Sequence, residues 1–327
     1  MKNLIRTILL SATLLTTSMG YAQELSRVSG AFADIGFGTR PVSMGYAFVG
    51  LADDENSTFW NPAGLSQVDS YKVGFSQADQ FGLIKYNYFS ALIPLPFKNQ
   101  SVGISAISTG DAALQELSFH AAYGAKFDFV SVGIGLKYRN ASYGNNTLNP
   151  DDYIVFDPNE VSIGLGQQVY GNANGFGLDF GLMFFPSKRV QFGILIRDLY
   201  APIKWDSKAR GADNNARGNY DEGMPMEVIF GSALKLNKNV QFVGDFQPAL
   251  SDELTNWVRL GVETRLVNVL LLRAGTEQGI NDFDDEKFTL GTGIDILIKD
   301  KVRIQSDFAY VINSIHNSQR ISFSISF

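Results

Sequence analysis

One histidine has neighbours of the kind that acid–base chemistry requires. Ser118 and Glu116 lie two and four residues before His120, so all three fall on one face of a segment with alternating polarity. A hydrolase needs a nucleophile, a base and an orienting group within reach of one another. Polar residues on one face are also typical of a strand that lines an aqueous space, and no Gly-x-Ser-x-Gly motif occurs. We therefore predict no catalytic residue and no enzymatic activity.

Two acidic clusters contain the oxygen ligands that Ca²⁺ prefers. They are Asp151-Asp152 and the run Asp282, Asp284, Asp285 and Glu286. Neither has the twelve-residue loop spacing, and both a Ca²⁺ site and simple solvation are compatible with them, so we assign no metal. The absence of cysteine excludes disulfides and thiolate sites. No phosphate loop or dinucleotide fingerprint is found, and we predict no cofactor.

The first 22 residues have the pattern of a signal peptide. Lys2 and Arg6 precede an apolar run from Ile8 to Leu15, and small residues follow up to Ala22. The apolar run is far shorter than the roughly 20 residues that a membrane-spanning helix needs. Removal of this segment leaves 25 basic against 33 acidic residues, a net charge of −8, which argues against a nucleic-acid partner.

The chain after residue 70 alternates apolar and polar residues with a period of two. Fourteen segments have this character, and high glycine and aromatic contents (32 Gly, 13% aromatic) agree with an all-β protein. The clearest segments are Gln115–Lys126, Phe129–Arg139, Gly177–Phe185, Val190–Asp198, Val240–Gln247, Trp257–Leu266, Phe288–Ile298, Val302–Asn313 and Arg320–Phe327.

The charged residues of these segments gather on one face, which admits two architectures. In a secreted sandwich the charged face meets water outside; in a membrane barrel it lines the lumen while the apolar face meets lipid. Connection lengths favour the barrel, because tight turns alternate with long connections at Ala141–Asn174 and Ala201–Gly223. We predict a transmembrane antiparallel β-barrel of about 14 strands over residues 70–327, with both mature termini on the short-turn, periplasmic side.

Residues 23–69 lack strand periodicity. A lumen of fourteen strands is wider than wall side chains can fill, so we predict that this segment forms a hatch inside it. Asn61-Pro62-Ala63-Gly64 has the composition of a sharp turn, an ordinary turn before the first strand being the alternative. The residues assigned to the hatch are Arg40, Pro41, Met44, Gly45, Phe59, Trp60, Asn61, Pro62, Ala63 and Gly64.

Three parts of this segment resemble the N-terminal plug of FadL-like outer-membrane proteins. They are the stretch from Gly38 to Gly45, its continuation Ala47–Asp54 and the block Trp60-Asn61-Pro62-Ala63-Gly64-Leu65. The sequence of these parts is most similar to that of the PorV/PorQ branch. The resemblance implies a barrel with an internal hatch, and a terminal Phe327 like the signal that outer-membrane assembly machinery recognises. Some such proteins carry hydrophobic molecules and release them sideways through a strand kink, whereas others serve type IX secretion. The sequence matches no kink motif near Val102–Ser105 and lacks the long insertions expected of a secretion shuttle.

Three functions follow as hypotheses. The first is transport or binding of hydrophobic small molecules in the outer membrane, with a pocket expected from Phe156, Val161, Ile163, Leu165, Tyr200 and Trp205. The second is a type IX secretion component that binds cargo or machinery through its outer loops. The third is a structural surface protein. Outer-membrane lipid is the expected environment in all three.

Overall fold

The computed structural model describes Phe32 and residues 35–80, 82–111, 113–145, 169–209, 217–250, 255–280 and 286–327. The predicted signal peptide, four of the expected pocket residues (Phe156, Val161, Ile163 and Leu165) and most of both acidic clusters lie outside these ranges. None of the helices within them has the length and apolar composition needed to cross a bilayer.

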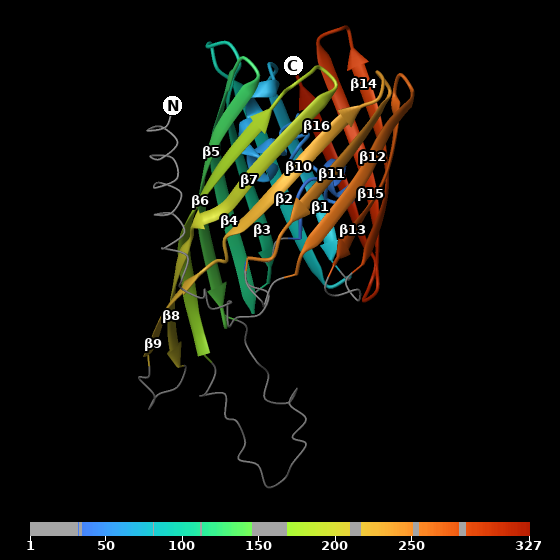
Figure 1. Ribbon diagram of the computed structural model, residues 1–327. Coiled ribbons are helices and arrows are strands. Elements are labelled where there is room, and N and C mark those ends of the chain that lie inside the picture. The colour runs from blue at the N-terminus through green and yellow to red at the C-terminus, as the bar shows by residue number, and fades with distance from the viewer. Residues whose placement is uncertain are drawn as a thin grey trace, which may run out of the picture.

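Fourteen antiparallel strands close into a barrel (Figure 1). Strand β1 pairs with both β2 and β16, β5 pairs with β6, and β7 pairs with β10, which completes the ring. The barrel strands are β1 Lys72–Gln80, β2 Ile84–Pro94, β3 Gln100–Gly110, β4 Leu114–Phe127, β5 Val130–Tyr143, β6 Val169–Phe184, β7 Val190–Tyr200, β10 Glu227–Lys235, β11 Val240–Gln247, β12 Trp257–Val267, β13 Leu270–Gly279, β14 Lys287–Ile298, β15 Val302–Asn313 and β16 Ser318–Ser326. The predicted barrel of about 14 strands is confirmed.

The alternation of the sequence has the orientation expected for a lipid-facing wall. In β16, Ile321, Phe323 and Ile325 are exposed on the outer face, whereas Arg320, directly before Ile321, is buried inside. Most charged residues of the polar faces are likewise buried in the lumen, among them Glu116, Lys137, Arg139, Asp179, Arg197, Asp245, Glu263, Asp295 and Asp307. The charged face is therefore the inner face.

Both predicted long loops contain more strand than expected. Ala201–Gly223 is largely a β-hairpin, β8 Pro202–Ala209 with β9 Arg217–Gly223, which pairs with the first half of β6 and projects beyond the barrel at the end opposite the C terminus (Figure 1). The hairpin forms because Ile203 and Trp205 alternate with polar residues and bury their side chains against Ala141 and Ala173. The predicted loop Ala141–Asn174 is likewise strand at both ends, since β5 continues to Tyr143 and β6 begins at Val169.

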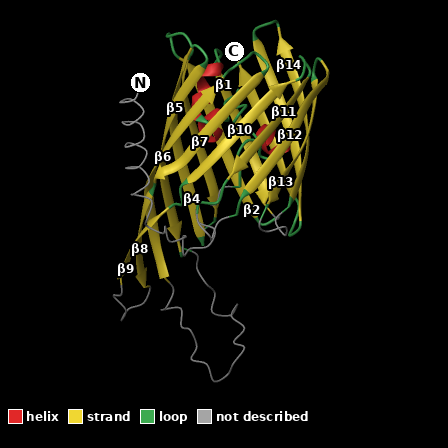
Figure 2. Ribbon diagram, in the orientation of Figure 1, coloured by secondary structure: helices red, strands yellow, loops and turns green. Residues whose placement is uncertain are grey.

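Residues 35–69, here called the inner segment, lie inside the barrel (Figure 2). They form the short helices α2 Thr39–Ser43 and α3 Ser57–Trp60 and the 3₁₀ helix η1 Pro62–Gln67. Helix α2 packs against strands β13–β16, and η1 packs against β3–β6 on the other side. The backbone N–H groups of Phe48 and Val49 donate to Asp245 of β11, at 2.8 and 2.9 Å. The segment thus touches the wall around most of its circumference.

Candidate functional site

Glycines of the wall let the backbone of the inner segment approach the strands closely. At ten wall glycines, each on a different barrel strand, an added Cβ atom would lie 2.1–2.9 Å from an atom of the inner segment. A glycine inside a strand often marks such close approach of another backbone. These glycines are Gly74, Gly103, Gly124, Gly133, Gly181, Gly193, Gly231, Gly261, Gly275 and Gly291. At six of them the nearest atom belongs to the backbone of the inner segment and at four to a side chain, so close shape complementarity fixes the inner segment in the lumen.

The turn predicted at Asn61-Pro62-Ala63-Gly64 begins η1. Asn61 is its N-cap, because the Asn61 Oδ1 atom accepts a hydrogen bond from the Ala63 N–H at 3.1 Å while the Asn61 side-chain amide donates to the Val49 carbonyl at 2.9 Å. Gly64 is helical rather than left-handed. Its small size matters instead, because a Cβ there would lie 2.1 Å from the Ala52 carbonyl oxygen.

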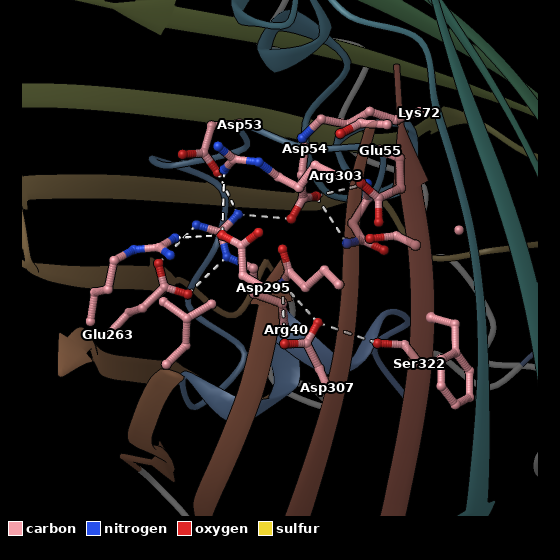
Figure 3. Close-up of a pocket in the computed structure, with 18 of the residues that line it drawn as sticks. Arg40, Asp53, Asp54, Glu55, Lys72, Glu263, Asp295, Arg303, Asp307 and Ser322 are labelled. Carbon is pink, nitrogen blue, oxygen red and sulfur yellow. Dashed lines mark hydrogen bonds and ion pairs between the residues drawn. The ribbon is translucent and has the colours of Figure 1, made fainter. Parts of the chain in front are cut away.

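Arg40 ties the inner segment to the wall through three carboxylates. Its guanidinium contacts Asp53 at 2.6 Å, Asp54 at 2.8 Å and, on strand β12, Glu263 at 2.9 Å (Figure 3). Glu263 also accepts a hydrogen bond from Arg273, which reaches Asp307 of β15 at 2.7 Å. The charges alternate in sign across the lumen, so each buried ion lies beside an opposite one.

A polar recess of about 370 Å³ opens beside this network at the short-turn end. Six acidic and six basic residues line it, and Figure 3 shows many of them converging from the inner segment and from strands of the wall. Burial, assisted by the neighbouring Asp54 carboxylate, raises the pKa of Glu55 in the inner segment from 4.5 to about 7. We call this space the short-turn recess.

A second space, of about 250 Å³, lies on the other side of the inner segment. Phe37 and Phe59 of the inner segment line it, with ring centroids 5.1 Å apart in an edge-to-face arrangement, and the wall contributes Tyr86 and Ile107. The His120 ring stacks on Phe59 at 5.7 Å. We call this space the aromatic cavity.

One side of the aromatic cavity is charged and contains Lys137 and Arg139, here called the basic cluster, which are paired with acids. Lys137 contacts Asp179 at 2.9 Å and Asp198 at 3.2 Å, and Arg139 contacts Asp198 at 2.8 Å. The second guanidinium nitrogen of Arg139, Nη1, has no hydrogen-bond partner among the described residues, although the side chain is more than nine-tenths buried. A buried donor without a partner is energetically unfavourable unless a ligand or water satisfies it.

The wall changes its pairing beside this cavity. Strand β7 carries two extra residues opposite β6, between the pairs Ile196–Phe180 and Tyr200–Leu178, and Asp198 within this bulge has a φ of 54°. Beyond Arg197, which pairs with Glu227, β7 separates from β10 and the chain enters the β8–β9 hairpin. Among the described strands, β9 pairs only with β8. Strand β3, in contrast, pairs with β2 and β4 without a register shift.

The residues expected to line a ligand pocket occupy different places. Tyr200 is exposed at the end of β7, and Trp205 is buried in the β8–β9 hairpin, where it packs on Tyr143 and donates to Glu222 at 3.0 Å. Neither lines the aromatic cavity, which draws instead on Phe37, Tyr86, Ile107 and the basic cluster. These residues come from segments far apart in sequence. The only signal in the sequence for them is the alternation that shows which residues of each strand face the lumen.

The possible catalytic trio faces the lumen without forming a catalytic arrangement. Glu116 accepts a hydrogen bond from the Phe32 N–H at 2.8 Å, and His120 Nδ1 has no partner among the described residues. Within the same residues no group of three His, Cys, Asp or Glu side chains is placed to hold a metal ion.

Neither a family model nor a curated protein matches the sequence. Solved structures, however, match the fold over most of the chain. The monoaromatic hydrocarbon channel CymD is 14% identical, with a TM-score of 0.60 over 89% of this chain and 97% of that one. The toluene transporter TodX of Pseudomonas putida is 13% identical (TM-score 0.56, 89% and 97%), and a Pseudomonas aeruginosa FadL homologue is 12% identical (0.57, 88% and 97%). The chain therefore shares the barrel fold of these proteins.

Proposed function

We propose that the chain is a FadL-like outer-membrane protein that binds and passes hydrophobic small molecules. The observation that carries this proposal is the aromatic cavity, a space between the inner segment and the long-loop end of a barrel whose outer face is apolar. Apolar and aromatic lining with a few polar groups is typical of small-molecule sites. The structural neighbours named as hydrocarbon and toluene carriers support the same class of ligand.

The polar end of the cavity narrows the ligand class. Arg139 Nη1 is a buried donor within the cavity lining, so a hydrophobic molecule with one hydrogen-bond acceptor would satisfy it. The apolar part of the lining is formed by Phe32, Phe37, Phe59, Tyr86, Ile107, Met224 and Pro225, beside polar residues such as Thr109, Glu116 and Ser118. The ligand would thus place its apolar body on the rings and its acceptor toward the basic cluster.

The route from the cavity follows the wall rather than the lumen. The inner segment fits closely against the wall glycines, which opposes passage past it. The junction where β7 separates from β10 borders the cavity through Asp198, Met224 and Pro225. We propose this junction as the exit, in place of a kink in β3, with the short turns and both mature termini in the periplasm and Phe327 recognised by the assembly machinery.

A space-filling substitution tests the proposal. Ile107→Trp should fill the cavity, whereas Ile104→Trp on the same strand points to lipid and serves as the control. Native mass spectrometry and gas chromatography of extracts from detergent-purified protein should find a small hydrophobic molecule in the wild type and in Ile104→Trp but not in Ile107→Trp. Absence of any such molecule from all three proteins, with normal uptake of toluene by a deletion strain, would refute the proposal.

A PorV/PorQ-type role in type IX secretion is the second candidate. The observation that favours it is the close fit of the inner segment, because a barrel that only binds cargo or machinery needs no open path. This role predicts that a deletion strain loses secreted proteins carrying C-terminal signal domains and that these proteins co-purify with the barrel. An unchanged secretome would remove this candidate.

A further inference from the structure

The short-turn end of the barrel carries more exposed basic than exposed acidic residues. Three of the turns and the connection between β14 and β15 contribute exposed lysines or arginines. None of these six side chains has an acidic partner within 4.0 Å among the described residues. The six, here called the basic collar, are Lys98, Lys188, Arg189, Lys238, Lys299 and Lys301. Only Asp69, Asp128 and Asp300 are exposed acids at this end.

Aromatic side chains lie at the same level as the basic collar. Phe97, next to Lys98, is 63% exposed, and Phe127 and Phe129 flank the following turn with similar exposure. Tyr71 and Phe327 stack at 5.7 Å where the first and last strands meet. Exposed aromatic residues at strand ends mark the bilayer interface, where phospholipid head groups lie. The collar is therefore at head-group depth.

Backbone hydrogen bonds hold the turns in a ring. The Lys126 N–H donates to Asn99 in the preceding turn at 3.0 Å, and the Phe185 N–H donates to Phe129 at 2.8 Å. The same bond recurs from Lys235 to Arg189 at 2.8 Å and from Arg265 to Asn239 at 2.8 Å. The backbone that carries the collar is thus fixed before any ligand binds, and less conformational freedom is lost on binding.

The opposite end of the barrel has no such excess of positive charge. Its exposed charges in the described ranges are mixed, with Lys85 and Lys204 beside Asp111, Asp206 and Asp221. The connections 146–168, 210–216, 251–254 and 281–285, which lie outside the described residues, contain ten acidic residues and one arginine in their sequence. The net charge of −6 is thus unevenly distributed along the barrel axis.

We propose that the basic collar binds the head groups of anionic phospholipids in the leaflet that surrounds the short turns. Lysines and arginines near a membrane surface are attracted by anionic lipid, and a zwitterionic head group offers no net charge to match. An acidic segment of a soluble protein is a different occupant, but it would not require the aromatic residues at the same level. The proposal rests on the insertion of the barrel in the membrane and not on the ligand of the aromatic cavity.

Native mass spectrometry of the full chain in detergent tests the proposal. The purified protein is titrated with phosphatidylglycerol and with phosphatidylethanolamine of the same acyl chains. We expect at least a threefold excess of phosphatidylglycerol adducts on the wild type. The excess should disappear in the triple variant Lys98→Gln, Lys188→Gln, Arg189→Gln and persist in the control Lys85→Gln, Lys204→Gln, Lys208→Gln at the other end.

The substituted side chains are at the surface, so folding can be verified by the mobility of unheated samples in SDS gels. Equal binding of the two lipids by the wild type would overturn the proposal. Unchanged preference in the collar variant would do the same, as would a loss of preference only in the control. Loss of ligand from the aromatic cavity has no bearing on this readout, so failure of one proposal is distinguishable from failure of the other.

Discussion

The two spaces on either side of the inner segment differ in what their polar groups do. In the short-turn recess Arg40 is enclosed by three carboxylates, two from the inner segment and one from the wall. In the aromatic cavity the rings of Phe37 and Phe59 form an apolar side, and Arg139 retains a buried donor that no described residue satisfies. The comparison teaches that a network of ion pairs anchors the inner segment on one side, while aromatic rings beside the unpartnered Arg139 donor leave a place for a ligand on the other side.

The largest expected effect comes from breaking the anchor. Arg40→Met would leave Asp53, Asp54 and Glu263 with less compensation, and removal of one partner from a buried ion pair costs about 3–5 kcal/mol of unfolding free energy. Urea titration of the barrel in micelles measures this loss. The matched control in the other space is Arg139→Met, which should lose less because Lys137 still neutralises Asp198. Equal losses for the two variants would contradict the difference between the two spaces.

The pH dependence of stability should reveal Glu55 in the short-turn recess. Because its pKa rises from 4.5 to about 7 on folding, the folded state favours the protonated carboxyl, and stability falls as the pH rises through this interval. The full difference corresponds to about 3 kcal/mol. Glu55→Gln should remove this part of the pH dependence between pH 5 and pH 8 in urea titrations, whereas Asp69→Asn at an exposed site should not. A slope unaffected by Glu55→Gln would show that the carboxyl is not buried in this way.

The fit of the inner segment against the wall, which separates the two spaces, can be tested at a single glycine. A Cβ at Gly133 would lie 2.2 Å from the Ala63 nitrogen, so Gly133→Ala should overpack the contact and lower the unfolding free energy by about 1–3 kcal/mol. Gly135→Ala, two residues along the same strand and on the same face, places its Cβ at an ordinary 3.4 Å from Asp179 and is the control. Planar-bilayer recordings of the Gly133→Ala variant would also show whether displacement of the inner segment opens a conducting path. Identical behaviour of the two variants would argue against a close backbone fit.

Much of the barrel was predictable because its signal is local. The alternation in Val302–Asn313 and Arg320–Phe327 specifies strand, inward face and outward face from neighbouring residues alone, and β15 and β16 follow it. The charged faces then identify the lumen. The β8–β9 hairpin was missed because its length suggested a loop, although Ile203 and Trp205 already alternate with Lys204 and Asp206.

The site was less predictable because it depends on contacts between distant residues. Gly133 contacts Ala63 across 70 positions, and Phe59 meets His120 only when β4 faces the inner segment. The composition showed that glycine is abundant, but not that ten strands turn a glycine toward one segment. The aromatic cavity likewise combines the inner segment with four or more strands, whose relative stagger no local pattern specifies.

The contacts of the wall glycines also constrain the order of assembly. The inner segment precedes β1, yet it touches Gly275 and Gly291 more than 200 residues later, so its contacts form only after nearly the whole chain is available. Contacts between residues so distant in sequence make folding slow. A backbone that lies against backbone on most sides has no room to slide into a finished ring. We therefore expect the final pairing of β1 with β16, completed where Tyr71 and Phe327 exchange hydrogen bonds at 3.0 Å, to close around an inner segment that is already in place.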